Sequence, residues 1–369
     1  MGIFALLLIS TGNFTHSPFD SYINYGQDAN AVDASAQSVQ TAQPVQMMEL
    51  PTPQLDKELY DQLMLALANN PIPKISTTTV ATSTVASTSS LVIAPNYLWP
   101  VKTAPYPDFG SILPFHRIVA YYGNFLSTKM GVLGQYPPEQ MLSMLEQEVA
   151  KWQAADPSTP VVPALDYIAV TAQGYPGPDG KYRYRMPDSE IDKAIELADQ
   201  VNGIVILDVQ VGLSTVRDEV PLLEKYLKLP NVELALDPEF AMSPGQVPGK
   251  YIGTLSATDI NYAAYYLAEI VNLYKLPPKV LIVHRFTENM VTDYQNIDPL
   301  PEVQVVMDMD GYGTPAQKKK VYADVVYSEP VQFSGIKLFY KNDITYGGRM
   351  MTPEEVLSMR PIPSFIQFQ

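Results

Sequence analysis

Eight short hydrophobic runs alternate with amphipathic runs between residue 115 and the last residue, 369. The hydrophobic runs are RIVAYYGN, VVPALDYIAV, GIVILDVQVG, VELALDPEF, KVLIVHRF, VQVVMDMDGYG, SGIKLFYKND and SFIQFQ. Strands that alternate with helices build parallel sheets, and eight such units in about 250 residues are typical of a closed barrel. The sequence therefore predicts an α/β fold over residues 115–369, a (β/α)8 TIM barrel.

The runs between these strands have the apolar spacing and the start signals of helices. They are PPEQMLSMLEQEVAKWQAA, DSEIDKAIELADQV, STVRDEVPLLEKYLKL, SATDINYAAYYLAEIVNLY and TPAQKKKVYADVVY, with TENMVTDYQNI and TPEEVLSM as shorter segments. Several open with Ser, Thr, Asp or Pro, as N-caps and first helical turns prefer. A doubly wound open sheet is the alternative, but GNFLSTKMGVLG after the first strand lacks the G-x-G-x-x-G spacing of a dinucleotide site. We therefore expect no cofactor.

The first 114 residues differ from the rest in composition and hydrophobic pattern. Residues 1–30 contain an apolar run, Ile3 to Ile9, of the size of a signal-peptide core, although no Lys or Arg precedes it. Residues 31–114 form a low-complexity Ser/Thr/Pro-rich linker region with one candidate helix at 53–70 and the spacer STTTVATSTVASTSS at 76–90. This pattern predicts a largely disordered N-terminal region and an extracellular or cell-surface location, with the cell envelope as a partner through this region.

Charge and composition narrow the classes of binding partner and of chemistry that the sequence allows. The net charge is −15, the sequence pI is about 4.6, and the chain has no cysteine. Nucleic acids and anionic membranes bind proteins that supply Lys and Arg, so neither is expected as the main partner. Disulfides, thiolate catalysis and Cys-ligated zinc are excluded. The sequence does not indicate whether the protein is a monomer or an oligomer.

Polar side chains end most of the predicted strands, and they fall on one face of each. Because side chains alternate along a strand, Asp237 and Glu239 share a face with the small Ala235, while Leu234 and Leu236 share the other. The same alternation places further polar residues on the inner face at the carboxyl end of the barrel, where barrel active sites lie. They are Asp166, Asp208, Gln210, His284, Asp308, Asp310 and Lys337.

The carboxyl end of the predicted barrel, called its mouth below, is therefore rich in carboxylates. Such a site suits glycoside hydrolysis, which needs a protonated acid and a second assisting group. Glu239 is the expected acid, and Asp237 would polarise the substrate or tune Glu239. Asp166, Asp208, Asp308 and Asp310 are candidates for base, nucleophile or sugar ligand. Tyr122, Tyr312 and Tyr340 are expected to supply stacking surfaces or hydroxyls, with Gln210, His284 and Lys337 as further substrate contacts.

The Asp237-Pro238-Glu239 ending resembles the Asp-x-Glu motif of chitinase-like and muramidase-like glycoside hydrolases. That resemblance implies that Glu239 is the acid and that Asp237 orients an acetamido group. VVMDMDGYG is similar to the Met-x-x-Asp ending of the sixth chitinase strand, at Met307 and Asp310. VELAL stands where chitinases carry a Gly- and Asp-rich lead-in, and SFIQFQ stands where they carry a Trp.

The barrel as a whole resembles a group of uncharacterised secreted barrel proteins of bacterial cell surfaces, on the segments LDPEF, VHRF, DMDGYGTP, IKLFYKND and MTPEEVL. This resemblance implies the fold and a surface location. We expect a glycosidase-like hydrolase acting on a wall or surface polysaccharide. The alternatives are a non-catalytic glycan-binding or envelope-scaffold barrel, and a metal-dependent hydrolase using Asp166, Asp208, His284 and Asp308. The lone strand-end histidine and the absence of a His-x-His pair predict no zinc site.

Overall fold

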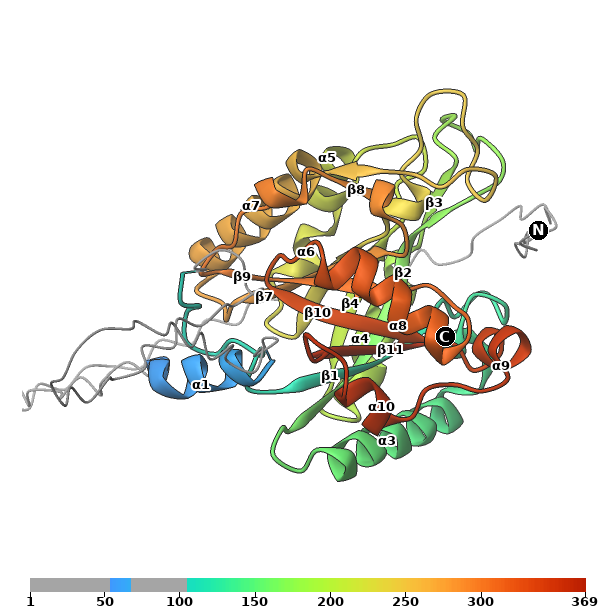
Figure 1. Cartoon of the computed structure of the whole chain (residues 1–369). Helices are drawn as coiled ribbons and strands as arrows, with labels where there is room; N and C mark the ends of the chain where they lie inside the picture. The colour runs from blue at the N-terminus through green and yellow to red at the C-terminus, as the bar shows by residue number, and fades with distance from the viewer. Residues whose placement is uncertain (1–53, 68–104) are drawn as a thin grey trace, which may run out of the picture. The chain divides into compact units, whose positions relative to one another are not determined.

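A computed structural model of the protein describes residues 54–67 and 105–369. Within them, eight parallel strands pair side by side and close on themselves through the contact of β1 with β2 (Figure 1). They are β1 Arg117–Gly123, β2 Val161–Ala172, β4 Ile204–Val209, β5 Val232–Leu236, β7 Lys279–Arg285, β9 Val303–Met309, β10 Phe333–Leu338 and β11 Phe365–Phe368. The predicted (β/α)8 barrel is confirmed. The predicted signal segment and the 76–90 spacer lie outside the described residues.

Helices connect most of the consecutive barrel strands on the outside of the sheet (Figure 1). They are α2 Val132–Gln135, α3 Pro138–Ala155, α4 Asp188–Asp199, α5 Val216–Glu219, α6 Glu224–Leu227, α7 Ala257–Tyr274, α8 Pro315–Tyr322, α9 Asn342–Gly347 and α10 Pro353–Leu357. Short 3-10 turns lie at Val220–Leu223, Pro238–Phe240, Glu288–Met290 and Tyr294–Asn296, and a π-helical turn at Ala323–Tyr327. The short strand β3 Arg183–Arg185 pairs antiparallel with the end of β2, and β6 Leu255–Ser256 pairs with β8 Val291–Thr292.

Two connections differ from the helices that the sequence predicts. The segment after β4 divides into α5, a 3-10 turn and α6 around Pro221, which has no backbone N–H for a continuous helix. The segment after β7, predicted as a short helix, forms two 3-10 turns with β8 between them. Asp293 there has a left-handed backbone with φ of 58°, which interrupts a helix.

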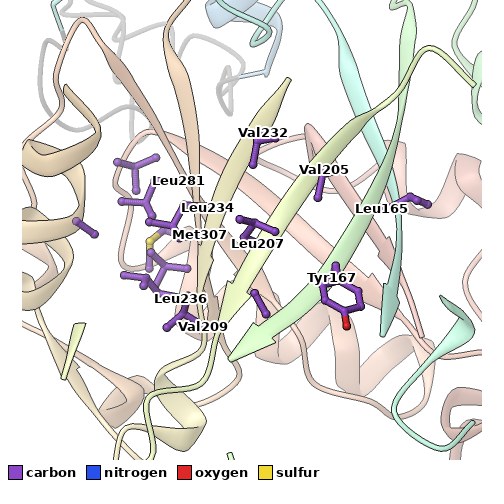
Figure 2. Packing of buried hydrophobic residues seen from close by; sticks show 14 of the residues in the cluster. Leu165, Tyr167, Val205, Leu207, Val209, Val232, Leu234, Leu236, Leu281 and Met307 are labelled. Carbon is purple, nitrogen blue, oxygen red and sulfur yellow. The ribbon is translucent and has the colours of Figure 1, made fainter. Parts of the chain in front are cut away.

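The two faces of the barrel strands carry two separate hydrophobic clusters. Leu165, Leu207, Leu234 and Leu236 point outward and pack under the helices (Figure 2). The inner cluster contains Ala120, Ala164, Ile206, Ala235, Ile282, Val306, Phe333 and Phe365. The alternation that the sequence predicts therefore holds around the barrel, and it fixes which side chains enter the interior.

The interior cluster is completed by residues that precede the barrel. Tyr60 and Met64, from helix α1 (Lys57–Leu67), belong to it together with Leu113. Gln304 holds Leu113 by both backbone groups, accepting its N–H at 3.0 Å and donating to its carbonyl at 2.5 Å. The helix α1 falls in the segment that the sequence assigns to the linker region, and its buried face is an extension of the barrel core.

Met64→Ala should lower the free energy of unfolding of the barrel by about 2 kcal/mol or more, because it removes a buried side chain from the interior cluster. Leu65→Ala is the matched control on the same helix: Leu65 is 39% exposed, and its loss should change stability by no more than about 0.5 kcal/mol. Urea unfolding of the whole chain measures both. Equal effects of the two substitutions would show that α1 is not part of the barrel core.

Candidate active site at the barrel mouth

Buried polar side chains from consecutive strands meet at the carboxyl ends of the barrel strands. The strand register aligns His284 with Asp308, and Lys337 with Gln367. Tyr122 of β1 aligns with Asp166 of β2. The buried polar set comprises Asp166, Asp208, Gln210, Asp237, His284, Asp308, Asp310, Lys337 and Gln367. Side chains placed on one face by the sequence pattern therefore lie on one continuous inner surface.

His284 lies between two carboxylates. Its Nδ1 is 2.9 Å from Asp308 Oδ2, and its Nε2 is 3.2 Å from Asp208 Oδ2. The first contact has the geometry of a hydrogen bond, whereas the second is an ion-pair contact without that alignment. Burial opposes the charged imidazolium, but the close contacts with Asp208 and Asp308 and the charges of these two groups outweigh it and raise the pKa of His284 well above its usual value. His284 is therefore a buried cation at neutral pH.

Gln210 links Tyr122 to Asp237 by hydrogen bonds. Its amide nitrogen donates to the Tyr122 hydroxyl at 3.1 Å and to Asp237 Oδ2 at 3.2 Å, while its oxygen accepts the Ala172 N–H at 3.0 Å. Asp237 Oδ1 accepts the backbone N–H of Glu239 at 3.2 Å. Asp237 therefore fixes the backbone from which the Glu239 side chain projects. Burial, followed by the charges of Asp208 and Glu239, raises the pKa of Asp237 well above its usual value.

Lys337 supplies the second positive charge. Its ammonium lies 3.6 Å from the centre of the Tyr122 ring and 5.5 Å from that of Phe339, both within cation–π range. Burial and the charge of Asp208 raise the pKa of Asp166 to about 8, and His284, Lys337 and a hydrogen bond from Gln367 oppose that rise. Lys337 thus acts on the carboxyl groups through its field across the mouth.

Glu239 and Asp310 form the outer pair of carboxyl groups. Glu239 is half-buried, and Asp310 is 8% exposed, whereas Asp166, Asp208 and Asp308 are fully buried. Burial and then the charge of Asp310 raise the pKa of Glu239 to about 7. Asp310, rather than Asp237, is therefore the chief charged neighbour that keeps Glu239 protonated, which differs from the sequence-based expectation. One Asp310 oxygen, Oδ1, has no hydrogen-bond partner in the described parts of the chain.

The remaining predicted residues divide between the mouth and other surroundings. Tyr122 lies in the network, and Tyr312 lies on the rim, 49% exposed. Tyr340 does not join them. It lies beyond the end of β10, packs with the outer cluster, and its hydroxyl is 3.0 Å from that of Tyr121. The alternation that turns Lys337 inward turns Tyr340 outward, so the structure does not bring Tyr340 together with the other predicted site residues.

Full burial also changes the expectation for two predicted catalytic carboxylates. Asp308 is bonded to His284, and Asp166 accepts a 2.5 Å hydrogen bond from Gln367. Both are 0% exposed, so a substrate at the mouth does not reach them in this conformation. Both are thus more deeply buried than Asp310, which is 8% exposed, and Glu239, which is half-buried.

Two contributors were missed by the sequence analysis. Gln367 holds Asp166, and the alternation along SFIQFQ, applied to the last strand, places it inward at the level of Lys337. Gly335 makes room for Asp308: a Cβ there would lie 2.6 Å from Asp308 Oδ1. A glycine on an inner strand face is the sequence signal of such a close approach.

The opposite end of the barrel is chemically different from the mouth. A cavity of about 280 Å³ lies there beside Glu233, whose carboxylate accepts the Val280 N–H at 2.6 Å.

Within residues 54–67 and 105–369, no three His, Asp or Glu side chains are grouped as a metal site requires. No helix in these ranges is long and apolar enough to cross a membrane.

The likeness of this chain to known proteins is weak. No family model matches the chain, and no curated protein matches it. A ruminal GH26 endo-β-1,4-mannanase aligns with a TM-score of 0.32 at 10% identity, over 68% of this chain and 58% of the mannanase. GH26C from a Muricauda species aligns with a TM-score of 0.28 at 12% identity, over 72% of this chain and 75% of that protein. The chain thus spans less than two thirds of the mannanase, and the strand pairing alone establishes the barrel.

Asp166→Asn should make the protein more stable at pH 8 than the native chain, by about 1–3 kcal/mol. The folded chain keeps a proton on Asp166 up to about pH 8, while the unfolded chain releases it near pH 4, so this carboxyl opposes folding increasingly as pH rises between those values. The amide keeps the shape and can still accept from Gln367.

Urea unfolding of the two proteins at pH 4.5 and pH 8 measures the effect, which should nearly vanish at the lower pH. Asp192→Asn, on the exposed face of α4, is the control and should leave the difference between the two pH values unchanged. A stability gain of the same size at both pH values would contradict the assigned pKa of Asp166.

Lys337→Met should destabilise the protein more at pH 8 than at pH 5, by about 1–3 kcal/mol. The ammonium lowers the pKa values of Asp166, Glu239 and Asp310, and it matters most when those groups are ionised. Unfolding titrations at the two pH values provide the measurement, with Lys193→Met on α4 as the control. Equal losses at both pH values would place Lys337 outside the field of the carboxyl groups.

Proposed function

We propose that this protein is a glycoside hydrolase that uses Glu239 as its general acid on a wall or surface polysaccharide. One observation carries the proposal: Glu239 is the outermost carboxyl group of the network and has a pKa of about 7 beside Asp310. A general acid works best with a pKa near the working pH, and a glycosidase raises that of its acid carboxyl by burial and by a neighbouring carboxylate.

Asp310 is the proposed second carboxyl group of the reaction. It acts either as a base that activates water or as the nucleophile at the anomeric carbon, and the two roles require different carboxylate separations. Its side chain is 8% exposed, and its buried Oδ1 has no hydrogen-bond partner in the described parts of the chain. Asp237 is a positioning residue, because it holds the Glu239 backbone N–H. The buried His284 cation and Lys337 supply positive charge that limits how far the carboxyl pKa values rise.

The location follows as part of the same proposal. An apolar segment at residues 3–9 and a Ser/Thr-rich spacer at residues 76–90 are typical of secreted proteins tethered at a distance from an envelope. A polysaccharide outside the cell is the substrate that such a location offers to a barrel with an acidic mouth. A glycan-binding barrel without catalysis is the alternative outcome of the test below.

The test begins with a screen of acetamido-sugar polymers and peptidoglycan, then neutral and amino-sugar polysaccharides, for release of reducing ends. On the glycan that is cleaved, Glu239→Gln should lower turnover by about 10²–10⁴-fold while binding persists, because the amide keeps the shape but delivers no proton. Glu139→Gln, exposed on α3, is the control and should retain full turnover.

The pH profile provides an independent readout of the same assignment. Turnover should fall as pH rises through about 7, where Glu239 loses the proton it must donate. Asp310→Asn removes the charge that raises this pKa. For any residual turnover, the fall on the alkaline side of the pH profile should therefore shift to lower pH. Equal cleavage by Glu239→Gln would disprove the role of Glu239, and binding of glycans without cleavage of any would support the binding-module alternative.

A further inference from the structure

Two exposed tyrosine rings lie together at the rim of the mouth. Tyr312 follows Asp310 by two residues at the end of β9, and Tyr346 comes from α9. Their ring centres are 5.3 Å apart with the planes inclined by 36°, and the rings are 49% and 58% exposed. In Figure 1, α9 lies beside the end of the barrel to which β10 runs. Large aromatic rings left in solvent as a pair offer an apolar surface to a ligand.

A continuous series of contacts joins these rings to the acidic network. Tyr312 packs edge-on against Phe339, with ring centres 5.9 Å apart and planes at 78°. Phe339 in turn lies 5.5 Å from the Lys337 ammonium, which rests on the Tyr122 ring. A ligand on the tyrosine pair is therefore next to the residues that surround Glu239 and Asp310.

The loop that carries Tyr312 is anchored on both sides of that residue. Lys318 donates to the Gly311 carbonyl at 2.7 Å, and the Gly313 N–H donates to Asp343 at 2.9 Å. Lys318 and Asp343 are themselves paired, with a 3.2 Å contact between Nζ and Oδ2, and both are buried.

The same buried pair ties the two neighbouring elements to that loop. Asp343 accepts the Phe339 N–H at 3.0 Å, and Lys318 donates to the Lys337 carbonyl at 2.6 Å. The end of β10, the loop after β9 and the start of α9 are thus joined at one point. The backbone around Tyr312 and at the start of α9 is held in place before a ligand arrives, which reduces the entropy lost on binding.

The negative charge of the whole chain selects among ligands that could stack there. Burial raises the pKa values of Asp166, Asp237, Glu239 and Asp310, so the mouth itself is less negative than its six carboxyl groups suggest. The chain as a whole has a net charge of −15. An anionic ligand would approach a protein of like charge, which opposes binding, whereas an uncharged or amino-bearing ligand would not.

We infer that Tyr312 and Tyr346 form a stacking platform for a sugar ring adjacent to the bond that is cleaved, and that the ligand is a neutral or amino-sugar chain rather than a uronic-acid chain. The inference rests on the proposed glycosidase function and adds the substrate class to it. A pyranose ring presents C–H groups to the faces of tyrosine rings, while the tyrosine hydroxyls can bond to sugar hydroxyls. Tyr346 is assigned here as a binding residue with no part in proton transfer.

The experiment uses the full chain carrying Glu239→Gln, so that bound oligosaccharides are not turned over. Calorimetry compares cellohexaose, chitohexaose, a chitosan hexamer and hexagalacturonic acid. One of the neutral or amino-sugar oligomers should bind at least about tenfold more tightly than the uronic acid, and Tyr346→Ala should weaken that binding by about three- to tenfold. Tyr346→Trp should restore it. Tyr274→Ala, a tyrosine on α7 that is 41% exposed, is the matched control and should leave affinity unchanged.

The outcomes separate this inference from the proposed function. In the active chain, Tyr346→Ala should raise KM more than it lowers kcat on any glycan that is cleaved. A cleaved glycan whose binding ignores Tyr346→Ala, or preferred binding of hexagalacturonic acid, would overturn the platform and leave the hydrolase intact. Binding that depends on Tyr346 without cleavage by the native chain would overturn the hydrolase and leave the platform. Binding of none of the four oligomers would overturn the platform.

Discussion

The placement of His284 between Asp208 and Asp308 is the interaction on which the barrel mouth depends. A carboxylate removed from water is costly, and two of them close together in the barrel interior repel each other unless a cation lies between them. His284 provides that cation and is itself charged because the two carboxylates surround it. The three groups therefore need each other, and together they form the charged floor below Glu239 and Asp310.

The barrel provides the stability that such a floor requires. Below the polar residues, small and branched side chains such as Ala164, Ala235 and Val306 fill the interior, and Leu113, Tyr60 and Met64 belong to the same cluster. Outside, the longer leucines of the same strands pack beneath the helices. The apolar part of each strand thus carries the folding energy, while its polar end is free to hold groups whose pKa values depart from their usual values.

Much of this arrangement was predictable because hydrogen-bonded strands alternate their side chains strictly. The inward positions of Asp166, Asp237, His284 and Lys337 follow from that rule applied to short stretches of sequence. The rule does not give the stagger between strands, so it could not show that His284 contacts both Asp208 and Asp308. It also could not show that Asp310, and not Asp308, lies beside Glu239.

Other differences have similarly local causes. The sequence offered α1 as a helix in a low-complexity region, but only the folded chain shows that Tyr60 and Met64 enter the barrel core. Pro221 divides one predicted helix, and a left-handed Asp293 interrupts another. The buried Lys318–Asp343 pair joins residues from separate elements, and no spacing in the sequence announces such a contact.

Depth in the mouth gives chemically identical carboxyl groups different roles. The deepest, Asp208 and Asp308, are committed to His284, and Asp166 is committed to Gln367. Asp237 accepts a hydrogen bond from Gln210 with one oxygen and from the backbone N–H of Glu239 with the other. Each inner group thereby fixes the position or the proton of a group further out, and the series ends at Glu239 and Asp310. Because Asp166, Asp208 and Asp308 are fully buried, the outer pair is the part of the network left to meet a ligand.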